Sequence, residues 1–179
     1  MGLAEVIEKA FAGREMPARL TDSDFDPLDS DLADVLSFSG RNWREITWND
    51  WKRHNIALCF FTRDALAYLL PSVLLLSLQR PSEYLSSAAY LVNTFGSLDW
   101  APSPDHWKDY FRARFVGLRT EEYDAIKEWL LFMSNLEIYR KHINRKPGSG
   151  DIFERAIETV CLARRESLRG GDGLHWPKP

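Results

Sequence analysis

An apolar stretch over residues 56–79, IALCFFTRDALAYLLPSVLLLSLQ, is the feature that most limits how this chain can fold. From residue 65 to residue 78 it consists almost wholly of Ala, Leu, Val and Tyr. A helix that is apolar on every side is stable only when other helices surround it. We therefore predict a central helix over about 63–79, enclosed by the rest of the chain.

Two residues predict the shape of this central helix. Thr62 precedes its first turn, where the hydroxyl can accept a hydrogen bond from an otherwise unpaired backbone N–H, so we expect Thr62 to be the N-cap. Pro71 lies inside the helix and has no N–H to donate to the preceding turn. We therefore expect a kink near Tyr68.

The same stretch argues against membrane insertion. The apolar run is shorter than the roughly 20 residues that span a bilayer. Extending it to residue 56 would place the charged Arg63 and Asp64 in the hydrocarbon. The N-terminal sequence MGLAEVIEKAF has two acidic residues and no long apolar core, so we expect no secretory signal. These features predict a cytoplasmic protein that does not contact membranes.

Apolar residues at helical spacing predict the other elements. We expect helices over 3–11, 32–38, 48–54, 83–93, 106–115, 120–142 and 151–168. Thr47 and Thr120 are the expected caps of two of them. No alternation of apolar and polar residues is long enough for a sheet. A chain of 179 residues most simply forms one domain. The predicted fold is therefore an all-α, single-domain helical bundle over 1–179, with a C-terminal tail over 170–179.

The charges are unevenly placed, although the formal net charge is only −3. The segment 22–34 holds six aspartates and no basic residue, whereas the chain from Arg140 onward is rich in Arg and Lys. Such polarity can steer a charged partner. A solvated acidic loop and a docking surface for a basic partner both fit the pattern. The candidate partner-binding residues are Asp22, Asp24, Asp26, Asp29, Asp31 and Asp34.

We expect no metal site and no cofactor. The segment from Asp22 resembles the start of an EF-hand loop, but Pro27 stands where the loop needs Gly and Ala33 where it needs Glu. The four histidines and two cysteines lack the spacing of metal ligands. The short motifs of dinucleotide, phosphate, acyl and zinc-protease chemistry are missing, although catalytic groups can also converge from distant positions.

One aromatic group has two interpretations. Trp43, Trp48 and Trp51 are interleaved with a basic set that consists of Arg41, Arg44, Lys52 and Arg53. Bases could stack on such rings while the cations meet phosphates. The same spacing suits core packing, and the chain is net acidic, so we favour the core and do not expect nucleic-acid binding.

Three sequence pieces resemble an uncharacterised bacterial domain family. They are KAFAG over 9–13, WREI over 43–46 and YLLP over 68–71, with the acidic stretch between the first two. A later piece, FVGLRTEEYDAIKEWLLFM over 115–133, is similar to the family's hydrophobic helix. This chain has Leu69 and Leu70 before Pro71, where the family more often has a second Tyr. The resemblance implies a soluble helical bacterial protein and supplies no catalytic residues.

Together these features favour a binding protein over an enzyme. We interpret the chain as an immunity-type protein that neutralises a bacterial toxin by masking its active site or substrate surface. A small enzyme with a site near the kinked central helix, using Tyr68, Asp64 or His54, is the alternative. A nucleic-acid-binding module is a third possibility. The sequence assigns neither the identity of the toxin nor the oligomeric state.

Overall fold

The computed structural model describes residues 1–22, 30–97, 104–143 and 151–170. These ranges form helices and no strand, which confirms the predicted all-α, single-domain fold for them. The α-helices are α1 (Leu3–Phe11), α2 (Ser30–Leu36), α3 (Trp48–Arg53), α4 (Arg63–Gln79), α5 (Ser86–Phe95), α6 (Asp109–Phe115), α7 (Thr120–Ser134), α8 (Glu137–Ile143) and α9 (Ile152–Gly170). Three short 3-10 helices join them: η1 (Trp43–Glu45), η2 (Asn55–Cys59) and η3 (Pro104–His106).

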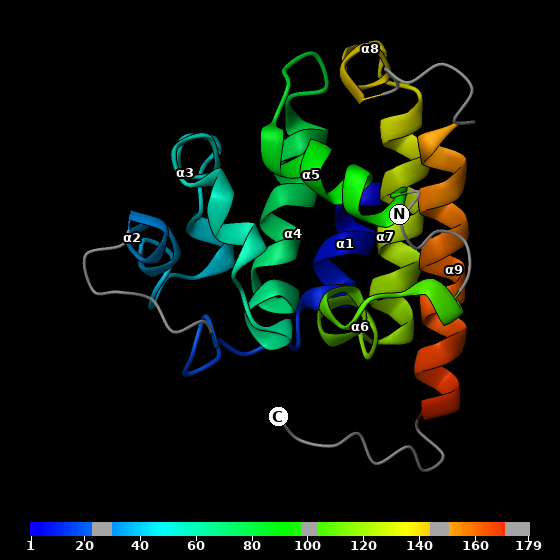
Figure 1. The fold of residues 1–179 in the computed structure, drawn as a ribbon. Helices are drawn as coiled ribbons and strands as arrows, with labels where there is room; N and C mark the ends of the chain where they lie inside the picture. Colours follow the sequence, from blue (N-terminus) through cyan, green and yellow to red (C-terminus); the bar gives the residue numbers. More distant parts are fainter. Residues whose placement is uncertain (23–29, 98–103, 144–150, 171–179) are drawn as a thin grey trace.

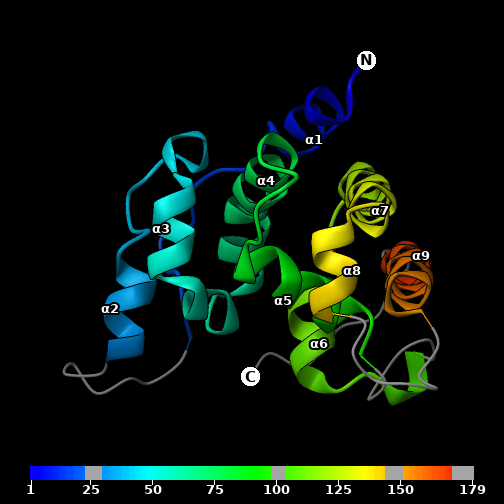
Figure 2. The same ribbon diagram turned by 90° about the horizontal axis from the view of Figure 1, so that it is seen from above.

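Helix α4 is the predicted central helix. It lies between α2 and α3 on one side and α1, α7 and α9 on the other (Figure 1). The view from above shows α4 between α3 and α7 as well (Figure 2). Every residue over 65–75 is buried. Thr62 Oγ1 accepts a hydrogen bond from the backbone N–H of Ala65 at 3.2 Å, which confirms the predicted cap. Pro71 lies within the continuous helix, and the kink near Tyr68 stays a prediction.

Two buried serines tie α4 to tryptophans on opposite sides of the molecule. The indole N–H of Trp51 donates to Ser72 Oγ at 2.9 Å, and that of Trp129 donates to Ser77 Oγ at 2.8 Å. Each serine hydroxyl donates in turn to the backbone carbonyl three residues earlier on α4. An unpaired N–H or hydroxyl at these positions would cost about 1–3 kcal/mol. The two serines of α4 therefore orient the tryptophans that pack against it.

The prediction of one helix over 120–142 is wrong, because the structure has two helices in this range. Helix α7 ends at Ser134 and α8 begins at Glu137. The Ser134 hydroxyl and the Asn135 side-chain amide both donate to the Leu131 carbonyl, each at 2.8 Å. Short polar side chains that bond to a nearby carbonyl compete with the helical backbone pattern. The change of direction lets the Tyr139 hydroxyl, at the end of its buried ring, accept the backbone N–H of Leu85.

The start of α7 also differs from the prediction. Thr120 is the first helical residue, and Arg119 is the N-cap. The carboxylate of Glu122, inside the first turn, accepts the backbone N–H of the N-cap residue Arg119 at 2.7 Å, and the Thr120 hydroxyl is not the cap. Other boundaries moved as well, and the helix predicted over 32–38 is α2 at Ser30–Leu36. The helix predicted over 106–115 is η3 followed by α6, and the helix predicted from residue 83 begins at Ser86. The C-terminal tail lies outside the described residues, apart from residue 170 at the end of α9.

Candidate functional site

The structure places three of the six candidate aspartates. Asp24, Asp26 and Asp29 lie outside the described residues. Asp22 has 78% of its side chain exposed, and its nearest cation is Arg19 at 3.9 Å. Asp31 is half-buried in the first turn of α2. Of the three placed candidates, Asp22 therefore has the most exposed carboxylate described here.

Asp34 has a partner within the chain. Its Oδ1 lies 2.7 Å from Nδ1 of His54, and both side chains are partly buried. The ring of Phe38 meets the His54 ring edge-on, with centroids 6.2 Å apart. These contacts fasten α2 to the end of α3. The carboxylate of Asp34 thus has a structural role that the sequence did not indicate, because its partner lies 20 residues away.

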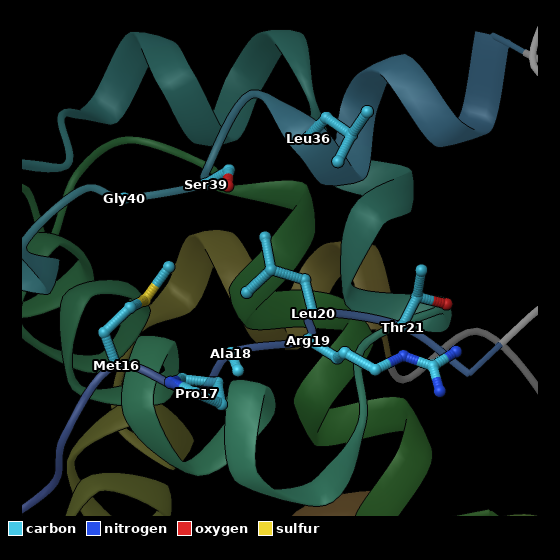
Figure 3. Close-up of a pocket in the computed structure, with 9 residues that line it drawn as sticks. All are labelled: Met16, Pro17, Ala18, Arg19, Leu20, Thr21, Leu36, Ser39 and Gly40. Carbon is cyan, nitrogen blue, oxygen red and sulfur yellow. The ribbon is translucent and has the colours of Figure 1, made fainter.

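An open groove lies next to Asp22, because the neighbouring residue Thr21 is part of its lining. It has a volume of about 450 Å³ and runs between residues 16–21 and the C-terminal end of α2. Met16 and Leu20 project from the first wall toward α2, where Leu36 and Ser39 lie on the other side (Figure 3). Leu20 is buried, and Leu36 is 53% exposed. The groove therefore has an apolar floor and an apolar edge that is open to solvent.

The wall formed by residues 13–21, here called the N-terminal strap, has no regular secondary structure and is fastened at both ends. At one end, Arg14 Nε and Nη2 donate to the two carboxylate oxygens of Glu122, each at 2.6 Å. Arg119 Nη2 also donates to the Gly13 carbonyl at 3.1 Å. At the other end, the Leu20 carbonyl accepts the backbone N–H of Thr62 at 2.8 Å.

The Arg14–Glu122 pair is the most buried ion pair among the described residues. Glu122 is fully buried, and 17% of the Arg14 side chain is exposed. The hydrogen bonds from Arg14 to Glu122 raise the pKa of the guanidinium above its ordinary value. Removing two charges from water costs several kcal/mol for each ion, so such a pair is weak evidence of net stabilisation. Its bidentate geometry instead fixes the position of the strap on α7.

The residues of the alternative enzyme site do not meet. The Tyr68 hydroxyl donates to the backbone carbonyl of Arg41 at 3.4 Å. Asp64 is exposed in the first turn of α4, and His54 contacts Asp34. No contact joins the Tyr68, Asp64 and His54 side chains in the described structure. None of the three side chains lines the groove, whose lining comes from residues 16–21, 36, 39 and 40.

The tryptophan group is part of the core, as predicted. Trp43, Trp48 and Trp51 are all buried. The guanidinium of Arg44 lies 4.0 Å from the centroid of the Trp43 ring, which it covers from outside. Arg41 forms an ion pair with Asp50 at 2.9 Å. These rings are therefore not available as a stacking surface for bases.

Potential metal ligands are scattered in the described ranges. No group of three or more His, Cys, Asp or Glu side chains there could hold a metal ion. The EF-hand-like segment lies mostly outside the described residues, so its rejection stays a sequence argument. Cys59 and Cys161 are half-buried free thiols.

The chain matches no protein-family model, no curated protein and no solved structure. The resemblance carried by KAFAG, WREI and YLLP therefore stays a prediction. Within the described ranges, no helix combines the length and the apolar character needed to cross a lipid bilayer.

Proposed function

We propose that this chain is an immunity-type protein that binds a bacterial toxin and covers its active site or substrate surface. The observation that carries the proposal is the open apolar groove beside the exposed Asp22, at the start of a segment with six aspartates and no base. A partner that covers the exposed Leu36 and fills the groove would remove apolar surface from water, which favours binding. The groove lies on the outside of a core whose centre, α4, is filled by packed side chains.

The charge of this surface defines the kind of toxin. A surface rich in carboxylates attracts a basic partner and raises the rate of encounter at low salt. A toxin that acts on a polyanionic substrate presents basic groups to that substrate. An acidic protein that covers those groups blocks substrate binding by direct competition.

The test is copurification with the product of the neighbouring gene, followed by calorimetry of the purified pair. We expect one-to-one binding that weakens as salt rises, because exposed charges are screened within about 8–10 Å at 0.1–0.15 M ionic strength. Two purified proteins that show no heat of association, in a titration where both are folded, would refute the proposal.

A pair of charge reversals locates the interface. Asp22→Lys should weaken toxin binding by about fivefold, chiefly through slower association, because it reverses a charge at the rim. Glu158→Lys is the matched control, since it makes the same charge change at an exposed position of α9, on the far side of α4 from α2. Equal effects from both variants would show that net charge, and not this surface, governs binding.

A further inference from the structure

We draw no further inference here: the strongest candidate, the open groove between the N-terminal strap and the C-terminal end of α2, belongs to the surface already proposed to bind the toxin, and nothing in the described structure shows what covers it.

Discussion

Replacing Arg14 with alanine would leave the fully buried Glu122 carboxylate with one described donor, the backbone N–H of Arg119. Breaking a buried ion pair by removing one partner costs about 3–5 kcal/mol, because the remaining charge is stranded away from water. We expect Arg14→Ala to lower the free energy of unfolding by an amount in this range. Glu122→Gln should cost less, about 1.5–3 kcal/mol, since Arg14 is partly exposed and has Asp64 and Glu121 nearby.

The double variant gives the sharper test. Arg14→Ala combined with Glu122→Gln strands no charge, because the glutamine is neutral and can still accept the Arg119 N–H. The double variant should therefore be more stable than Arg14→Ala alone, although it carries one more substitution. The coupling between the two positions should be about 1–3 kcal/mol. Additive losses would contradict this account.

The assay is urea unfolding at pH 7, followed by tryptophan fluorescence. A loss below about 1 kcal/mol for Arg14→Ala would show that water reaches Glu122 and that the pair is not truly buried. A double variant less stable than Arg14→Ala alone would show that the cost comes from lost packing and not from a stranded charge.

Three further predictions concern other parts of the molecule. A hydrogen bond from Arg41 holds the pKa of Asp50 below its ordinary value of about 4. The ionised Asp50 carboxylate therefore contributes its full stabilisation when the pH is above its ordinary pKa. This stabilisation is lost as the pH falls through the lowered pKa of the folded state. The difference in urea midpoint between the native chain and Asp50→Asn should therefore shrink below about pH 4, and a constant difference would contradict it. A Cβ at Gly96 would lie 2.5 Å from the carbonyl oxygen of the first residue of α9. Gly96→Ala should therefore cost about 1–3 kcal/mol, and an unchanged melting temperature would show that α9 moves aside freely. Asp34→Ala should lower stability by about 1 kcal/mol, whereas Asp22→Ala should change it by less than about 0.5 kcal/mol. Equal melting temperatures for those two variants would contradict the different roles of the two carboxylates.

The sequence predicts the parts of this fold that depend on local chemistry. The cap at Thr62 was predicted because its hydroxyl precedes an apolar run, and the structure has this cap. Thr47 was predicted to be a cap in the same way, and it caps α3 in the structure. The burial of α4 follows from composition alone, since a helix apolar all round has no face to offer water. The break after Ser134 was missed, because the apolar spacing continues through Leu136 while the polar side chains act on the backbone.

The site depends on contacts that no local pattern indicates. From the sequence, Glu122 is predicted to be an ordinary acidic residue in the first turn of a helix. Arg14 is predicted to be a polar residue in a loop. Their pairing joins positions 108 residues apart. Leu36 looks like an apolar residue on the inner face of a short helix, and only the packing of α2 shows that it faces outward. No local pattern separates Asp34, which has a histidine partner, from the other five aspartates.

The long sequence separation between Arg14 and Glu122 also determines when, during synthesis, the first helix can reach its final packing position. Helix α1 packs against α4 and α7, so the ribosome must release more than a hundred further residues before its main partner exists. Until then, α1 can pack only against α4, and the apolar surface that faces α7 in the finished protein is open to aggregation or to a chaperone. Assembly of this protein therefore joins the part made first to a part made late.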